Sequence, residues 1–467
     1  MNNVTYFNSY VTSFFFKGTT FALLIESKTI LDKQKLFHHP MYKYKQNGSV
    51  LLKRIFLSFC LAGFFVINCQ AQQDTTKKDT IVQQFYSVNQ APLFWFSSDK
   101  NRSKATEWLT MIETSESFGI VSDQYQSNQI HVALLSNNTL DNINKEQRDQ
   151  QITGMVLNFL KNLQEGNIKF DYDEVNVSRD SMYIHQLLNS KPGESVSQMV
   201  SRLDCKDRDY IVLKKYLNDS ITAKDTLKYK SVILAMNYRR YFTANHTSEY
   251  IVANIPATEA SYYRNDFLKL KMRTVVGKQK NKTPLIASYI TNIVTFPHWN
   301  VPHSIAVKEI LPKVQKNENY LEQHNYSVVN ARGKELDDSN LKWENYTEKN
   351  FPYFFRQATG PRNALGVLKF NLENPFSIFL HSNGWQGVFK KDIRFLSHGC
   401  IQLEKPLELA KELLPDKIDI KELKSGKKNT KSKTLALTHK IPVFIIYMPV
   451  TVNGTKVTFL KDVYNLI

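Results

Sequence analysis

Apolar positions in the first half of the chain recur with the period of a helix. Residues 104–119 place Ala105, Trp108, Leu109 and Ile112 on one face, and Gly119 follows as a stop signal. The same spacing covers six apolar residues of 151–166, namely Ile152, Met155, Val156, Phe159, Leu160 and Leu163. These stripes predict amphipathic helices that face a common core, not a cofactor-binding sequence.

The period changes to two after about residue 247. Residues 266–277 alternate Leu, Met and Thr with Lys and Arg and end at Gly277, which predicts a half-buried strand. Further strand patterns lie at 249–256, 376–381, 441–450 and 455–460, and a short helix is predicted over 405–415. The polar stretch 310–350 lacks a long period, as is typical of a cap or lid inserted in a domain.

These patterns together predict an α+β chain of two to three domains, which its 467 residues can readily form. A helical scaffold domain is expected over residues 85–247, after a polar linker at 72–84. A β-rich domain is expected over 248–467, with the cap inserted at about 310–350.

The N-terminal region carries the pattern of an export signal. Lys53 and Arg54 precede an apolar run at 55–67, and Ala71 fits a cleavage site. That run is too short to span a bilayer as an ordinary transmembrane helix. Since such signals are N-terminal, the start is expected at Met41, and residues 1–71 are interpreted as leader and signal peptide. An uncleaved signal would instead anchor the chain in the inner membrane.

The formal net charge of +18 has two interpretations. It is compatible with a lysine-rich soluble protein, and it also favours attraction to an anionic polymer or membrane surface. The lysines are scattered and no zinc-finger or RNA-binding motif is present, so no nucleic-acid partner is predicted. No Cys/His spacing fits zinc, and residues 277–284 lack the phosphate-loop pattern, so no metal and no cofactor are expected.

Two of the four cysteines, Cys60 and Cys69, lie in the signal, so the exported chain keeps only Cys205 and Cys400. This is too few for a disulfide scaffold. A Cys205–Cys400 disulfide is one interpretation, and an unpaired nucleophilic Cys400 is the other.

The segment FLSHGCIQLEKP around Cys400 favours the nucleophile. A cysteine attacks as its thiolate and needs a base. His398 lies two residues away, and His381 ends a predicted strand 19 residues upstream. A turn at Gly399 would let backbone N–H groups face a developing oxyanion. From local spacing alone, a simple turn beside a buried cysteine remains an alternative.

The pattern H…SHGCIQL resembles the active-site signature of the YkuD-type L,D-transpeptidases. Residues 296–312, 356–381 and the C-terminal PVFIIYMPV…VTFLKDVY resemble the larger periplasmic members of the YcbB type. The segments 233–242 and 249–257 resemble the entry of that group into its catalytic domain. The likeness covers residues 230–467 and, more weakly, the helical part from about residue 85.

The resemblance implies a cysteine acyltransferase acting on peptidoglycan. Cys400 would be the nucleophile, His381 the base and acid, and the Ser382 carbonyl would orient the imidazole. The site would be lined by Ser397, His398, Gly399 and Ser382, with the Gly399 and Cys400 amides as the oxyanion hole. A donor stem tetrapeptide would form a thioester, release D-Ala and pass to an acceptor amine, giving a 3→3 cross-link. The implied location is the periplasm or cell envelope of a Gram-negative-type bacterium.

Substrate contacts are less well defined, because Gln402 stands where the family has an arginine. Arginine binds a carboxylate with two hydrogen bonds, whereas glutamine is neutral. Arg394 and Lys405 are the candidates to replace it, and Trp299 is a candidate wall residue or substrate contact. The family's peptidoglycan-binding module has no clear counterpart, since residues 186–230 are short and charged.

Two alternatives stay open. Water instead of an amine could resolve the thioester, which would make the protein an L,D-carboxypeptidase or hydrolase. A wall-binding protein with an impaired site is the second alternative, motivated by Gln402 and by the positive charge. A papain-like protease is not favoured, since its cysteine pattern and downstream His/Asn order are missing.

Overall fold

The computed structural model describes residues 80–121, 142–220, 225–360, 362–425 and 430–467, all of which belong to one compact unit, residues 78–467. The predicted signal peptide, Met41 and the first part of the predicted linker lie outside the described residues. None of the helices in the described ranges is long and apolar enough to cross a membrane.

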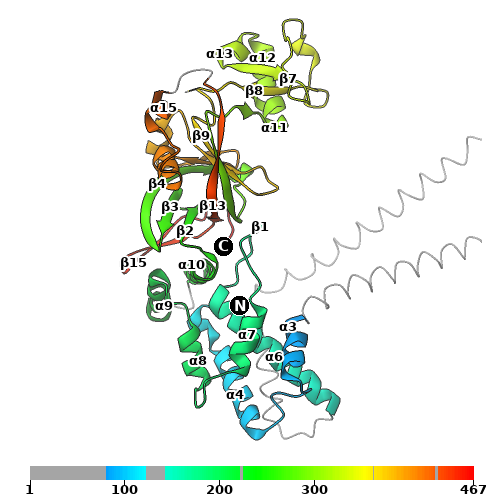
Figure 1. Ribbon diagram of the computed structural model, residues 1–467, viewed down its shortest axis with the longest axis vertical. Helices are drawn as coiled ribbons and strands as arrows, with labels where there is room; N and C mark the ends of the chain where they lie inside the picture. The colour runs from blue at the N-terminus through cyan, green and yellow to red at the C-terminus, as the bar shows by residue number, and fades with distance from the viewer. Residues whose placement is uncertain (1–79, 122–141, 221–224, 361, 426–429) are drawn as a thin grey trace, which may run out of the picture. The chain divides into compact units, whose positions relative to one another are not determined.

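The N-terminal part is helical (Figure 1). Its elements are α3 (Thr80–Asn89), α4 (Asp99–Glu113), η1 (Ser115–Phe118), α6 (Asn142–Glu165), α7 (Asp180–Leu188), α8 (Val196–Leu203), α9 (Arg208–Ser220) and α10 (Thr226–Asn245). Helix α3 begins inside the stretch expected to be a linker, because Phe85 is fully buried in the helical core and gives that polar segment an anchor.

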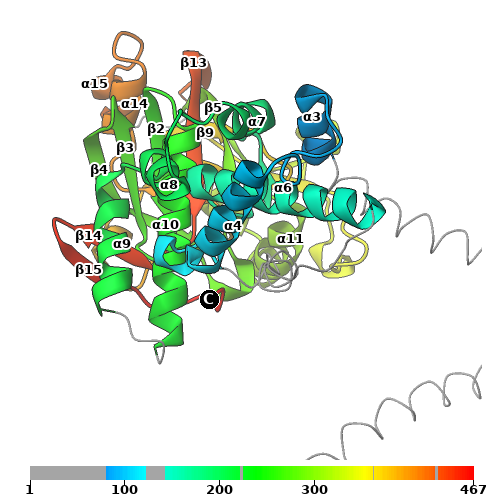
Figure 2. The ribbon, with the colours of Figure 1, turned by 90° about the horizontal axis from the view of Figure 1, so that it is seen from below.

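Both predicted apolar stripes face this helical core. Trp108, Leu109, Phe159 and Leu160 are among its fully or almost fully buried members, and α6 contacts α4, α7 and α8 (Figure 2). The Ser98 side chain caps α4 by accepting a hydrogen bond from the Asn101 N–H. The fold of this part therefore follows directly from the helical period in the sequence.

The C-terminal part is built on one sheet that closes on itself. Its main strands are β2 (Glu249–Asn254), β3 (Glu259–Arg264), β4 (Phe267–Gly277), β5 (Ile286–Thr295), β9 (Leu368–Leu372), β10 (Phe379–His381), β12 (Ile401–Leu403) and β13 (Lys433–Ile446). Their order is β5-β13-β2-β3-β4-β12-β10-β9, and β9 pairs again with β5. Closure leaves no free edge in this ring and fixes the register of the strands near Cys400.

Smaller elements complete the domain. β11 (Phe395–Ser397) pairs with β4, and β14 (Val450–Asn453) pairs with β15 (Lys456–Phe459). Helices α14 (Pro406–Leu413) and α15 (Ile420–Ser425) follow β12, and Leu409 and Leu413 of α14 enter the main core. In β4, Leu268 is 51% exposed, so the predicted buried face of that strand begins only near Leu270.

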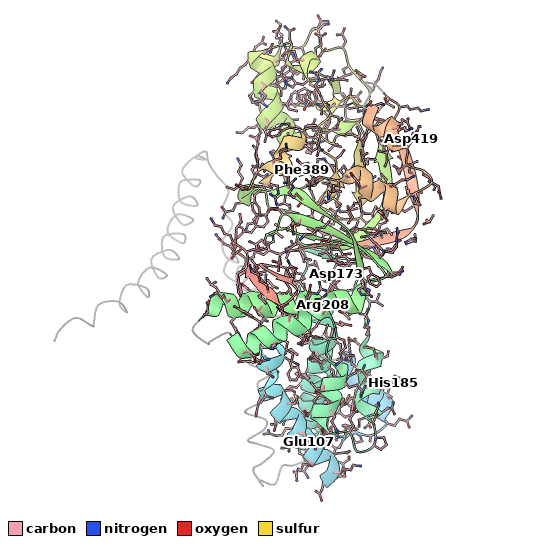
Figure 3. The ribbon with its side chains drawn as sticks, turned by 90° about the vertical axis from the view of Figure 1, so that its left-hand side faces the viewer. Glu107, Asp173, His185, Arg208, Phe389 and Asp419 are labelled. Carbon is pink, nitrogen blue, oxygen red and sulfur yellow. The ribbon has the colours of Figure 1, made fainter. Side chains whose placement is uncertain are left out.

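The helical and β-rich parts share contacts. Tyr238 and Phe242 of α10 form a cluster with Phe444 of β13. The short strand β1 (Tyr172–Asp173) joins β5 in parallel, and Asp173, labelled in Figure 3, accepts hydrogen bonds from the Tyr241 hydroxyl. These contacts join α10 to the closed sheet of the C-terminal part.

The cap is inserted between β5 and β9. It contains β6 (Trp299–Asn300), α11 (His303–Ile305), η4 (Ala306–Ile310), α12 (Leu311–Lys316), α13 (Tyr320–Gln323), β7 (Tyr326–Val329), η5 (Trp343–Asn345) and β8 (Phe354–Gln357). A three-stranded sheet, β6-β8-β7, and a separate core that includes Val301, Trp343 and Phe355 hold it together. The cap thus extends beyond 310–350 at both ends, because the apolar flanks supply its core.

Candidate active site

Three neighbouring strands determine which residues face the site. β10 pairs with β12 so that Leu380 lies opposite Ile401, and β10 pairs with β9 so that Leu380 lies opposite Phe370. These three side chains are fully buried in the main core. Because side chains alternate along a strand, the next set of partners, His381, Gln402 and Lys369, faces the other side. Cys400 shares that side with Gln402, two residues later.

The His381 ring is held in one tautomer. Its Nδ1 lies 2.6 Å from the Ser382 carbonyl oxygen. A carbonyl oxygen can only accept, so Nδ1 carries the hydrogen and Nε2 keeps the lone pair of a base. The residue is only 4% exposed, and burial lowers the pKa of His381 to about 4. The imidazole is therefore neutral near pH 7.

Ser382 also anchors this geometry through its hydroxyl. The hydroxyl donates to the Leu365 carbonyl (2.9 Å) and accepts from the N–H groups of Val367 (2.8 Å) and Leu368 (2.9 Å). Gly366 lies against it with a φ of +62°, and a Cβ at this position would lie 2.3 Å from Ser382 Oγ. The sequence predicts Ser382 as a lining residue with an orienting carbonyl, but it indicates neither the role of its hydroxyl nor that of Gly366.

The Cys400 thiol is half-buried and unpaired, which excludes the Cys205–Cys400 disulfide. Its Sγ lies 3.7 Å from the Ser377 carbonyl oxygen. Burial raises the pKa of the Cys400 thiol to about 11, although a hydrogen bond from the Phe379 backbone and the charge of Lys369 oppose this rise. Thiol and imidazole are thus both neutral at rest, so the thiol proton has to move to His381 as attack begins.

The loop before Cys400 is held by its own hydrogen bonds. Ser397 Oγ donates to the Cys400 carbonyl (2.6 Å) and accepts from the Gly399 N–H (3.1 Å), while Thr283 Oγ1 donates to the Gly399 carbonyl (2.7 Å). Gly399 has a φ of +121°, which requires glycine. The Gly399 N–H therefore points back into its loop, contrary to the expectation that it faces an oxyanion. The Cys400 N–H remains the candidate oxyanion donor.

His398 contacts the cap. Its Nε2 lies 2.6 Å from Glu309 Oε1, and Glu309 belongs to η4. This ion pair joins the nucleophile loop to the cap, so His398 lies at the border of the site. Glu309 was not predicted, because a single glutamate in a polar segment carries no signal of its distant partner.

Each of the three predicted polar substrate contacts is hydrogen-bonded within the chain. Gln402 faces the same side as His381, and its Oε1 accepts a 2.6 Å hydrogen bond from Asn383. The Arg394 guanidinium donates to Thr258 Oγ1 (2.6 Å) and to the Lys391 carbonyl (2.8 Å), so it is used within the chain. The ammonium of Lys405 likewise binds a backbone carbonyl of β4 at 3.1 Å.

Trp299 and Trp385 lie in different surroundings. Trp299 packs against the core of the cap, with its ring 6.3 Å from that of Tyr326. Trp385, four residues after His381, is 60% exposed and had not been selected as a site residue.

Phe389 of η6 (Gln386–Lys390), labelled in Figure 3, forms a small buried cluster with Val275 and Val388. This cluster holds the segment after His381 against β4.

Lys369 is the clearest residue that sequence reasoning missed. Its signal is weak, because a lysine between Leu368 and Phe370 looks like the solvated side of any strand.

Across the described ranges, no group of three or more His, Cys, Asp or Glu side chains has a metal-binding arrangement.

Comparison with known proteins gives two domain matches. Residues 248–445 match the YkuD family, described as an L,D-transpeptidase catalytic domain, and residues 80–217 match a Scaffold domain. A Haemophilus influenzae protein named "Putative L,D-transpeptidase" is 34% identical over 240 residues, which are 50% of this chain and 47% of that protein. The chain thus spans about half the length of this relative.

Solved structures give a weaker likeness. The catalytic domain of an Enterococcus faecium L,D-transpeptidase acylated by ertapenem is 14% identical, with 43% of this chain and 99% of that chain covered and a TM-score of 0.21. An L,D-transpeptidase from Mycobacterium smegmatis is 13% identical, with 43% and 58% covered and a TM-score of 0.20. Scores this low transfer no residue roles.

The domain matches coincide with the two structural parts, and the first of them contains His381 at the end of β10 and Cys400 directly before the paired strand β12. The chain therefore contains a region, residues 248–445, that matches the YkuD L,D-transpeptidase catalytic domain, preceded by a region, residues 80–217, that matches a Scaffold domain.

Proposed function

We propose that this protein is a peptidoglycan L,D-transpeptidase that forms 3→3 cross-links through a thioester on Cys400. The observation that carries the proposal is the fixed tautomer of His381, whose Nε2 is left as a base one strand away from Cys400. The match of this region to an L,D-transpeptidase catalytic domain supports the reaction class.

The first half-reaction is acylation. Cys400 Sγ attacks the carbonyl carbon at the L-centre of diaminopimelate in a donor tetrapeptide, and the thiol proton passes to His381 Nε2. The Cys400 N–H donates to the oxyanion. The C–N bond to D-Ala then breaks, and the same proton passes from His381 to the leaving amine.

The second half-reaction is aminolysis. The side-chain amine of an acceptor diaminopimelate attacks the thioester carbonyl and loses a proton to His381. The C–S bond breaks, and the Cys400 sulfur recovers a proton, which restores the resting site. One histidine therefore serves as base and acid in both halves.

We propose further that the chain works outside the cytoplasm, in the periplasm or cell envelope. The export pattern at residues 51–73 supports this location. A net charge of +18 would also favour approach to an anionic wall polymer.

A hydrolase is the second candidate, because Cys400 is not fully buried and water could reach a thioester formed there. The protein from residue 72 onward would be incubated with disaccharide-tetrapeptide, and the products separated and sequenced by tandem mass spectrometry. Dimers with a 3→3 bond, missing in Cys400→Ala, support the transpeptidase. Tripeptide without dimer supports the hydrolase, and unchanged substrate supports an impaired wall-binding protein.

A further inference from the structure

Lys369 is a half-buried cation, and in the part of the chain that the structure describes it has no carboxylate partner. Other strand lysines form ion pairs, such as Lys271 with Glu259 (2.8 Å) and Lys440 with Glu373 (3.0 Å). For Lys369, no Asp or Glu oxygen within the described ranges lies at ion-pair distance. Its ammonium lies over the Phe379 ring, whose centroid is 4.2 Å from Nζ. An unpaired, partly desolvated ammonium calls for a functional explanation.

Strand register places this cation beside the catalytic pair. Lys369 lies directly opposite His381 in the β9–β10 ladder and on the same side of the sheet. Phe379, two residues before His381, is on that side as well, with its ring 5.7 Å from the imidazole. The ring therefore holds the ammonium next to the site through a cation–π contact.

The charge of Lys369 acts on both reacting groups: it favours the thiolate form of Cys400, and it makes His381 a weaker base. It lowers the pKa of the Cys400 thiol against the larger effect of burial, and it disfavours the protonated form of His381. The Cys400 thiolate in turn raises the pKa of Lys369, which burial lowers. A fixed positive charge here favours an anion on Cys400 and a neutral base on His381.

The remaining polar groups near the site offer no substitute. Gln402 is neutral and bonded to Asn383, while the cations of Arg394 and Lys405 are bonded to groups elsewhere in the chain. The Lys282 ammonium donates to the Tyr464 carbonyl at 2.7 Å.

We propose that Lys369 is a positioning residue that acts through Cys400, because its charge stabilises the negative charge that develops on the sulfur during attack. This role rests on the proposed function only in that Cys400 is the nucleophile. It does not depend on the identity of the acyl substrate, so the two proposals can fail separately.

The test is the pH profile of Cys400 alkylation by iodoacetamide in the full chain, with peptide mass spectrometry reading Cys400 apart from the other cysteines. Lys369→Met keeps the length of the side chain and removes its charge. It should raise the apparent pKa of Cys400 by about one unit, so alkylation below that pKa slows about ten-fold. Lys369→Arg should restore most of the wild-type profile.

Lys271→Met is the matched control, because it removes an exposed strand lysine that is paired with Glu259, and it should leave the profile unchanged. Should Lys369→Met fail to fold, as judged by thermal melting, Lys369→Gln takes its place. An unchanged profile in the charge-free variant would overturn the proposal. So would a higher KM for the tetrapeptide with unchanged alkylation, since Lys369 would then bind a substrate carboxylate. A shifted profile in a protein that makes no wall product would leave this inference standing and reject the proposed function.

Discussion

The buried, neutral His381 makes a quantitative prediction about acid stability. Its pKa is about 4 in the folded chain, against an ordinary value of 6.5. Between these values the unfolded chain binds a proton that the folded chain does not, so the free energy of unfolding falls as pH falls from 6.5 to 4. The full loss is about 3 kcal/mol, and it is recovered above pH 6.5. His381→Gln removes the titrating group but keeps a side chain that can donate to the Ser382 carbonyl.

Urea unfolding at pH 7.5 and pH 4.5, followed by tryptophan fluorescence, measures this contribution. Carboxylates titrate in the same range, so the informative quantity is the difference between wild type and His381→Gln at the two pH values. The wild type should lose about 2 to 3 kcal/mol more than the variant on acidification. Equal losses in both proteins would refute a neutral, buried His381. His185→Gln, which changes an exposed histidine of α7, is the matched control and should retain the wild-type loss.

Three further substitutions test the supports of the site. Ser382→Ala leaves the Val367 and Leu368 N–H groups without their hydroxyl acceptor. It should therefore lower the free energy of unfolding by about 2 to 4 kcal/mol, and a loss below about 0.5 kcal/mol would contradict this role. Gly366→Ala forces a Cβ against Ser382 and should lower the melting temperature. The control is Gly193→Ala, since Gly193 has a similar φ of +76° but open space around it, and it should lower the melting temperature clearly less. Equal shifts would contradict the close contact. Glu309→Gln weakens the ion pair with His398. Labelling of Cys400 by a bulky maleimide should then become faster, while the free energy of unfolding changes by less than about 1 kcal/mol. Unchanged labelling would mean that this pair does not hold the cap near Cys400.

Local patterns predicted much of the fold because they depend on neighbouring residues alone. The stripes of α4 and α6 and the strand β4 follow from apolar spacing, and the sharp turn at Gly399 follows from its residue type. Trp108 and Phe159 are buried in the helical core, as their spacing predicted.

The features that were missed depend on distant partners. The position of Lys369 beside His381 depends on the pairing of β9 with β10. The contact of Glu309 with His398 likewise depends on how the cap packs. The Gly399 N–H was expected to face an oxyanion, but the Ser397 hydroxyl competes for it within the same loop. The exposure of Leu268 reflects how far the strand runs beyond its core, which alternation along one strand does not encode.

The most direct test of the account is to trap the acyl-enzyme. The protein would be mixed with disaccharide-tetrapeptide, quenched in acid within seconds and analysed by intact-protein and peptide mass spectrometry. The account predicts an adduct with the mass of the disaccharide-tripeptide acyl group on the peptide that carries Cys400, released by hydroxylamine and lost in Cys400→Ala. An adduct on another residue, or cross-linked product formed equally well by folded Cys400→Ala, would contradict it.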